Sequence, residues 1–227
     1  PKGDLNTPYA LFKAKNVKPE VREEKVHKGR PIAPGTKHPM GRMLKKAGRA
    51  WYFLANQLRG DFFALPGVQE IPRFVDAAVN QMRAVGGGFC LQAFDIEGCY
   101  PNMPKTAILL AATELVAQLR RQGQKGVWIP RARTKKPSWC PPNKTQAGTW
   151  MPLQELVDIL DFTLHNSFIR MPDGTILKQA EGIPMGDCLS PGMTILTCAW
   201  MEREWMTGMS PLDRMFFKGC RYMDDIL

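Results

Sequence analysis

The chain has 227 residues, of which 44% are hydrophobic, and this is enough apolar material for one sizeable core or two small ones. Its net charge of +10 and its isoelectric point near 9.5 indicate a polyanionic partner, of which nucleic acid is the commonest. No run of eighteen or more apolar residues is present, so the sequence predicts no transmembrane helix and no membrane partner.

The positive charge is concentrated in two stretches of the chain. From Lys13 to Arg59 there are thirteen Lys or Arg residues against three Glu, and between Glu114 and Glu155 there are eight basic residues and no acid. This segregation weakens the alternative, a basic protein that binds no polyanion. The distribution therefore favours contacts with phosphate backbones.

The cysteines predict an intracellular, reducing compartment. Six are present, and they form neither a C-x-x-C motif nor a zinc-like pairing with the three histidines. Most stand in apolar surroundings, as reduced core thiols do. The nucleus, the cytoplasm and an organelle all remain open.

The N-terminal part contains a polar segment and a loop. Residues 1–27 are charged and poor in large apolar residues, so we expect a basic, extended arm. Residues 28–35 hold two prolines and two glycines and cannot form a helix interior. A loop or edge strand here would present Lys28 and Arg30, which suit triphosphate binding, although a solvated basic loop is the alternative.

Two amphipathic helices follow. From Met40 to Leu58 apolar residues recur every three or four positions, with basic residues on the opposite side that are either solvated or follow a nucleic-acid backbone. The same pattern recurs from Ile71 to Val85, with Pro72 tolerated in the first turn.

The next stretch predicts a buried strand that ends on an acid. The apolar run Phe89–Phe94 follows three glycines and leads into Asp95. A lone Asp in this place also suits the cap of a following helix. The alternatives are a helix cap and a member of a composite site.

The central part of the chain predicts two more helices and a hairpin. The helices run from Pro104 to about Arg121 and from Leu153 to Phe168, and the hairpin spans Ile169–Leu177. Residues 122–150 lack a sustained period, and we interpret them as a basic insertion on the surface, either a loop or a hairpin. Its three tryptophans either stack on bases or anchor the insertion to the body.

The last segments complete the pattern. Ser190-Pro191 begins a helix in the favoured order of cap and proline. Asp224 and Asp225 stand between apolar residues typical of a buried strand, and they share one face only if the chain turns sharply there. We expect a strand–turn–strand with both acids at its tip. A surface turn is the alternative.

Asp95 lies 129 residues before Asp224, so a shared site can only be made by the fold. Acids that converge from two strand ends suit a site for hard divalent cations. In such sites, ions about 3.5–4 Å apart activate an attacking oxygen and stabilise a leaving oxygen during phosphoryl transfer.

These residues resemble the palm motifs of reverse transcriptases. Asp95 with Tyr100 five residues on, and the run Tyr222–Asp225, resemble two of the motifs, and Glu181–Pro191 resembles the third, a Gly-Pro loop followed by a helix. Three motifs in the order of the family are far more specific than one.

The residues of these motifs most resemble those of Penelope-like retroelements and telomerase catalytic subunits. This resemblance rests on Asn102-Met103-Pro104, on the Gly182–Pro191 loop and on Arg30-Pro31-Ile32. The resemblance covers roughly Lys28 to Leu227. It implies an α+β fold, the fingers and palm of a right-hand polymerase, with a small antiparallel sheet packed on helices.

The resemblance also implies domains. After the arm come fingers over 28–88 and a palm over 89–227 that includes the insertion. Because the chain starts at Pro1 and stops just past its acid pair, we expect it to be part of a longer protein, with the thumb absent.

The implied function is RNA-directed DNA polymerisation, in which dNTPs are added to the 3′-hydroxyl of a primer. The implied cofactor is Mg²⁺, with Mn²⁺ as an alternative. The partners would be an RNA template, a DNA or RNA primer, dNTPs and a larger ribonucleoprotein. Asp95 and Asp224 would bind metal, with Asp225 in support and the Ile96 carbonyl as a further oxygen. Nucleotide-binding residues would be Arg30, Lys28, Tyr100, Met185 and Gly186, and template or primer contacts would come from Gly182, Pro184, Tyr222 and Met223.

Two residues of the motifs modify the expected nucleotide binding. Tyr100 stands where reverse transcriptases exclude a ribose 2′-hydroxyl, which disfavours RNA synthesis, although an ordinary packed Tyr is an alternative. Asp187 departs from the small residue usual after the glycine, and an acid near phosphates weakens nucleotide binding.

A competing function is a domesticated protein that keeps the fold as an RNA-binding or structural component of a ribonucleoprotein. Degenerate family members commonly lose the acids. Because all three acids stand in this sequence, the catalytic function is favoured.

Overall fold

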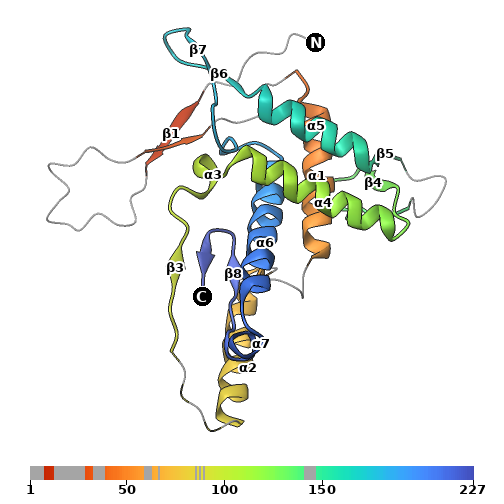
Figure 1. Ribbon diagram of the computed structural model, residues 1–227. Coiled ribbons are helices and arrows are strands. Elements are labelled where there is room, and N and C mark those ends of the chain that lie inside the picture. The colour runs from red at the N-terminus through yellow and green to blue at the C-terminus, as the bar shows by residue number, and fades with distance from the viewer. Residues whose placement is uncertain are drawn as a thin grey trace, which may run out of the picture.

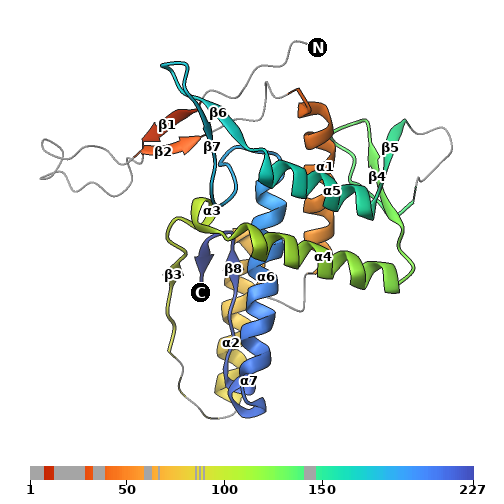
Figure 2. The same ribbon diagram turned by 45° about the horizontal axis from the view of Figure 1, so that its top comes forward.

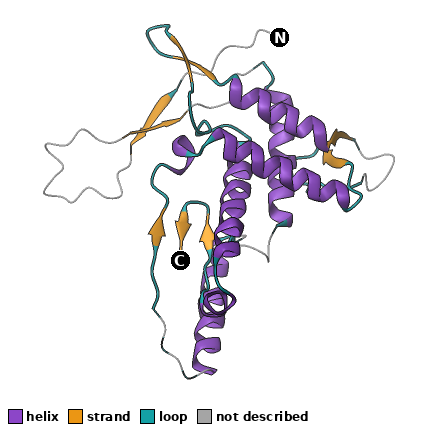
Figure 3. Ribbon diagram, viewed as in Figure 1, coloured by secondary structure: helices purple, strands orange, loops and turns teal. Residues whose placement is uncertain are grey.

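The computed structural model describes residues 8–12, 29–32, 39–58, 63–65, 67–84, 86, 88, 90–140 and 147–227. Helices make the body, and short antiparallel strand pairs lie around it (Figures 1 and 3). The helical elements are α1 (Gly41–Gln57), the 3₁₀ turn η2 (Val68–Glu70), α2 (Ile71–Ala84), α3 (Cys99–Asn102), α4 (Lys105–Arg121), α5 (Leu153–His165), α6 (Ser190–Gly208) and α7 (Pro211–Phe216).

The strands pair as one three-stranded sheet and three hairpins within the described ranges. The sheet has the order β3–β9–β8, and the hairpins are β1–β2, β4–β5 and β6–β7. Their bounds are β1 (Tyr9–Phe12), β2 (Gly29–Ile32), β3 (Phe94–Asp95), β4 (Gly126–Pro130), β5 (Gly148–Pro152), β6 (Phe168–Arg170), β7 (Ile176–Lys178), β8 (Arg221–Tyr222) and β9 (Asp225–Ile226). The expected α+β class is confirmed.

The core lies where α1, α4, α5 and α6 pack together, and in Figure 2 α4 crosses the long α6 while α5 crosses α1. The apolar stripes predicted from the sequence supply it, because one face of each amphipathic helix is removed from water. Trp51 of α1 is fully buried, and its indole N–H donates to the Leu156 carbonyl of α5 (3.3 Å). In α2 the predicted stripe is the less exposed face, although none of its residues is fully buried.

Two predicted elements need correction. The helix after Leu153 ends at His165, and Phe168 begins β6. Phe89 lies outside the described residues, and residues 90–95 are not a buried strand: among them only Phe94 and Asp95 are β-structure, and Leu91 and Phe94 are 57% and 58% exposed. The cause is a lack of cover, because within the described residues β3 pairs only with β9 and nothing buries the run.

The described residues of the segment 122–150 contain β4 and the start of β5, which pair as a hairpin that is only partly on the surface. Val127 and Ile129 of β4 are 0% and 2% exposed, and β4 packs against α1 and α5. Trp139 packs edge-on against Phe53 of α1, with ring centroids 5.1 Å apart. Of the two roles considered for the tryptophans, Trp139 therefore has the anchoring one.

Helices α1 and α6 approach closely because each places a glycine at the contact. A Cβ on Gly192 would lie 2.8 Å from the Tyr52 backbone nitrogen, and a Cβ on Gly48 would lie 2.1 Å from the Cys188 carbonyl oxygen, just before α6. Both obstructing atoms belong to the backbone, so neither can rotate away.

We expect Gly48→Ala to destabilise the protein by about 1–3 kcal/mol, the usual range for overpacking. The matched control is Gly208→Ala at the end of α6, where an added Cβ meets nothing within 4 Å. That variant should be neutral or slightly stabilised, since Ala favours a helix over Gly. Urea unfolding followed by tryptophan fluorescence measures both. Equal stability of the two variants would contradict the close contact.

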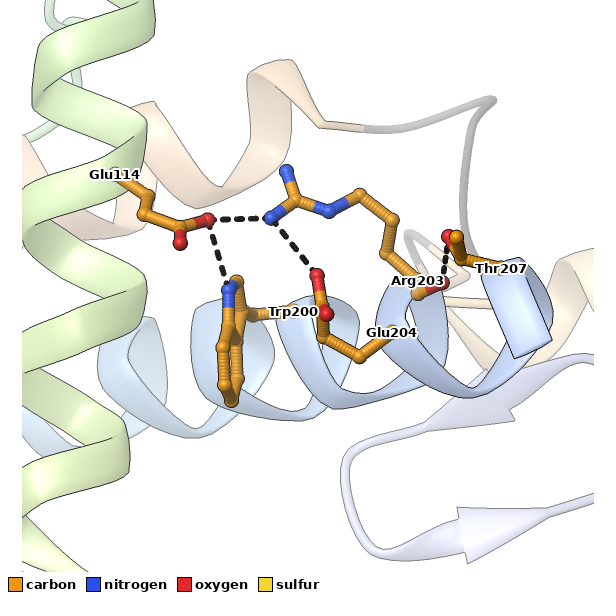
Figure 4. Close-up of polar contacts among 5 residues, drawn as sticks. All are labelled: Glu114, Trp200, Arg203, Glu204 and Thr207. Carbon is orange, nitrogen blue, oxygen red and sulfur yellow. Dashed lines mark hydrogen bonds and ion pairs between the residues drawn. The ribbon is translucent and has the colours of Figure 1, made fainter.

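A polar clamp joins α4 to α6 (Figure 4). The indole of Trp200 and the guanidinium of Arg203 both donate to Oε2 of Glu114, the former at 2.9 Å. The hydrogen bond from Arg203 and then that from Trp200 hold the pKa of Glu114 below its usual value of 4.5. The clamp is partly exposed, so solvent screens it.

This lowered pKa predicts a contribution to acid sensitivity. A carboxylate with a depressed pKa in the folded state contributes stability above its unfolded pKa, and that stability is lost as the pH falls through the folded value. Between pH 5 and pH 3 the wild-type protein should therefore lose more thermal stability than Glu114→Gln. Melting temperatures of both proteins across this range test the point, and parallel curves would contradict it.

Candidate active site

The fold brings the three sequence-predicted acids together in one small sheet. In the ladder between β3 and β9, Asp95 stands directly opposite Asp225. The Ile96 N–H donates to the Asp224 carbonyl (2.9 Å), which ties the turn of the second segment to the end of the first. Residues 129 positions apart thus share one site.

The acids lie on a strand–turn–strand, as expected, but they are not buried. Met223 and Asp224 form the turn between β8 and β9, Asp224 is half-buried, and Asp95 and Asp225 are exposed. Burial of the acids is therefore not the reason why a cation would bind here. Residues directly opposite in an antiparallel pair share a face with Cβ atoms about 4.5–5.5 Å apart, and like charges placed so are destabilising.

The charges of Asp95 and Asp224 both act on the Cys99 thiol. Cys99 begins α3, directly after the first acid segment. A hydrogen bond with Cys198 has the largest influence on its pKa and lowers it, while burial and the charges of Asp224 and Asp95 raise it. Both carboxylates are therefore close enough to act on one buried thiol.

The turn that carries Asp224 is held by a buried arginine. Arg221 is 1% exposed, forms an ion pair with Glu202 of α6, and donates from Nη1 to the Met223 carbonyl (2.8 Å). Met223 has a positive φ of 57°, which is unfavourable for a residue other than glycine. The Arg221 side chain thus fixes a turn that the backbone alone would not favour.

The backbone of Arg221 is held as well. Its N–H donates to the Phe63 carbonyl (2.6 Å), and its carbonyl accepts from the Leu65 N–H (2.7 Å). Burial raises the pKa of Glu202, although the hydrogen bond from Arg221 opposes this shift. The pair is desolvated, and each charge depends on the other.

The third motif packs against the first. Gly182 has a positive φ of 73°, and a Cβ there would lie 2.3 Å from the Pro101 carbonyl oxygen. The next residue, Ile183, donates its N–H to the Tyr100 carbonyl (2.9 Å). The close approach that Gly182 allows is therefore to its own chain in α3.

The loop then turns into α6 through hydrogen bonds of its own. The Leu189 N–H donates to Asp187 Oδ1 (2.8 Å), and the Ser190 hydroxyl donates to the Pro184 carbonyl (2.7 Å). The predicted cap at Ser190 is therefore wrong. Asp187, which departs from the family pattern, has a structural role at the start of this helix.

Tyr100, in α3, is half-buried and packs against the hydrophobic core. Burial raises the pKa of its hydroxyl, and the Asp224 carboxylate adds to this shift. Met185 is half-buried and Gly186 is exposed, with a positive φ of 98°. Tyr222 of β8 is exposed and pairs with Asp225.

The structure describes only one of the two basic residues assigned to nucleotide binding. Lys28 is outside the described residues. Arg30 lies in β2, with its Cα opposite Leu11 of β1. In both views the β1–β2 hairpin lies on the same side of the molecule as β3 (Figures 1 and 2).

Comparison with known proteins identifies the architecture. No protein-family model matches the chain, and no curated protein matches it. Solved structures do: telomerase from Candida albicans in complex with a TWJ fragment of telomeric RNA (TM-score 0.68, 12% identity, covering 99% of this chain and 38% of that chain) and apo telomerase from Candida tropicalis (0.63, 10%, 99% and 39%). A Candida tropicalis telomerase truncated from its C-terminal domain also matches (0.60, 10%, 99% and 44%).

The chain has a telomerase-like fold. It spans about two-fifths of the length of the telomerase chains it matches. At such low identity the likeness concerns the fold.

The sheet β3–β9–β8, which we call the acid sheet, offers carboxylate oxygens but an incomplete set of metal ligands. Among the described residues, no three His, Cys, Asp or Glu side chains form a cage for a metal ion. Mg²⁺, however, is usually held by one or two carboxylates together with water and substrate phosphates. Carboxylates opposed across a ladder, with more oxygen ligands to come from a substrate, fit that mode of binding.

Sequence reasoning missed Arg221 and Glu202. The signal was present, because Arg221 interrupts an apolar run that was expected to be a buried strand. A buried arginine requires an anionic partner, and α6 supplies one. The partner could not be named without the fold.

None of the helices in the described ranges is both long and apolar enough to cross a membrane.

Proposed function

We propose that this chain provides the palm and part of the fingers of an RNA-directed DNA polymerase, which adds dNTPs to the 3′-hydroxyl of a primer. The observation that carries the proposal is the convergence of three distant segments. Asp95 faces Asp225, Ile96 bonds to Asp224, and Ile183 bonds to Tyr100. The telomerase-like fold supports a reverse-transcriptase-related protein.

Asp95 and Asp224 would hold the metal ions, with Asp225 in support and the Ile96 carbonyl as a further ligand. When bound, two Mg²⁺ or Mn²⁺ ions would lower the pKa of the primer hydroxyl and stabilise the charge of the triphosphate during in-line attack. Asp95 and Asp225 carry like charges and stand opposite each other in the ladder. This supports the role, since a cation between them relieves their repulsion.

Other residues would position the substrates. The Tyr100 ring would exclude a ribose 2′-hydroxyl and favour deoxynucleotides, and the influence of the Asp224 charge on the Tyr100 pKa supports this role. The remaining contacts are proposed on the resemblance of the motifs: nucleotide contacts from Arg30, Lys28, Met185 and Gly186, and template or primer contacts from Gly182, Pro184, Tyr222 and Met223.

We also propose an RNA template, a DNA or RNA primer and a larger ribonucleoprotein as partners. The Candida albicans telomerase was solved with an RNA fragment, which makes RNA the first partner to test. A reducing compartment is proposed from the cysteines, because every described cysteine is a free thiol.

Primer extension on an RNA template, with Mg²⁺ and dNTPs, tests the proposal in the full-length protein beside Asp224→Asn. Extension by the wild type alone is expected. Ribonucleotides offered in place of dNTPs should be poor substrates if Tyr100 acts as proposed. If neither protein extends the primer but both bind RNA equally tightly, the enzymatic function fails and a structural role in a ribonucleoprotein replaces it.

A further inference from the structure

Away from the acid sheet, a cleft forms between α1 and the β4–β5 hairpin. One face of α1 lines it, together with the segment that follows β4 and the start of β5. We call this surface the basic cleft. It is defined by eight cationic side chains, namely Arg42, Lys45, Lys46, Arg49, Arg131, Arg133, Lys135 and Lys136.

No acid belongs to the described lining of the basic cleft. None of its cations belongs to an ion pair among the described residues. Eight like charges in one cleft repel one another, and a bound polyanion relieves that repulsion. The cleft therefore has the electrostatic character of an anion-binding surface.

Two of the cations build the cleft. Arg49 donates to the carbonyls of Pro130 (2.6 Å), Ala132 (3.2 Å) and Lys135 (2.7 Å), and it thereby fixes the hairpin to α1. Lys46 donates to the Thr149 hydroxyl (2.8 Å). A rigid frame of this kind holds the neighbouring cations in place without a ligand.

The remaining cations project around this frame. Partial burial and then the charge of Arg133 lower the pKa of Arg49, so Arg133 lies close to it. Arg42, Lys45, Arg131, Arg133, Lys135 and Lys136 are exposed. Tyr52, on the same face of α1, is 44% exposed within the cleft.

The basic cleft and the acid sheet lie on opposite sides of the molecule. In Figures 1 and 2 the β4–β5 hairpin is on the right, β3 and β8 are on the left, and α6 lies between them. A stretch of nucleic acid bound at the acids would therefore leave the basic cleft free, and a different nucleic-acid segment would have to occupy it.

We propose that the basic cleft is a second nucleic-acid site, which binds the phosphate backbone of a single-stranded RNA segment. Six exposed cations contact successive phosphates, and Tyr52 offers a ring on which a base stacks. Arginine forks match phosphate oxygens, and an aromatic ring beside them suits a nucleic acid better than an acidic peptide. The site needs no nucleotide addition, so it stands even if the proposed polymerase activity fails.

The test is equilibrium binding of a fluorescently labelled single-stranded RNA of about 20 nucleotides, measured by anisotropy in EDTA without dNTPs. The test variant carries Arg42→Gln, Lys45→Gln, Arg131→Gln and Arg133→Gln, and it spares Arg49 and Lys46, which hold the hairpin. The control carries Arg83→Gln, Arg121→Gln, Lys125→Gln and Lys218→Gln, four exposed positions outside the cleft with the same loss of charge. Circular dichroism checks that all three proteins are folded.

Each phosphate contact contributes about 0.7 to the slope of log affinity against log salt for a single strand. The test variant should bind more weakly, with a slope smaller by roughly 3, while the control keeps nearly the wild-type slope. An equal loss in both variants, or no change in the test variant, would overturn the proposal. Displacement of the RNA by polyglutamate of equal charge, as effective as displacement by unlabelled RNA, would assign the cleft to an acidic protein instead.

Discussion

Asp95→Asn is expected to reduce primer extension at least about a thousandfold, while it raises the stability of the metal-free protein. The first effect follows because bound metal supplies several kcal/mol of transition-state stabilisation, and about 1.4 kcal/mol corresponds to a factor of ten. The second follows because Asp95 stands opposite Asp225, and removal of one of two opposed like charges gains about 0.2–1 kcal/mol.

The pair of measurements separates a metal ligand from a structural acid. Single-turnover extension rates give the first effect, and urea unfolding in EDTA gives the second. Asp76→Asn, at an exposed position of α2, makes the same charge change and should alter neither. Retained extension by Asp95→Asn would remove this residue from the catalytic set. Lower stability would show that its carboxylate has a structural partner.

Arg221→Met is expected to destabilise the protein by about 3–5 kcal/mol, the usual cost when one partner of a buried ion pair is removed and the other charge is left behind. Glu202 would be the charge left behind, in surroundings that already raise its pKa. The double variant Arg221→Met/Glu202→Leu should recover much of this loss, because two apolar side chains then replace two buried charges.

Activity should not recover with stability. In the double variant the Met223 carbonyl still lacks its donor, so the turn that carries Asp224 is no longer fixed. Urea unfolding and primer extension on both variants test this, with Arg121→Met on the surface as the control. Full activity in the stable double variant would show that Arg221 serves stability alone and is not a positioning residue.

The sequence predicted the parts whose signal is local. The apolar stripe from Met40 to Leu58 became α1, because a period of 3.6 residues is a property of the helix itself. The acid-bearing turn at Asp224 was also predicted, since adjacent acids share a face only across such a turn. The hairpin between β6 and β7 followed from its turn residues.

What the sequence could not predict depends on packing between distant segments. The apolar run at Leu91 and Phe94 looks like a buried strand, yet burial depends on what covers it. Gly48 gave no sign that its missing side chain makes room for the Cys188 carbonyl. Arg49 was expected to be solvated or bound to phosphate, whereas its fork is occupied by three carbonyls of the hairpin.

The shortness of β3, β8 and β9 has a consequence for how the site responds to its substrates. Each strand has two residues, so few ladder hydrogen bonds oppose local opening of the acid sheet. A ligand that binds only the closed sheet stabilises it by about 2.7 kcal/mol at a concentration one hundred times its dissociation constant. Amide protons of the acid sheet should therefore exchange readily in the free protein and slow most when substrates bind, so that much of the order of the site comes from its own ligands.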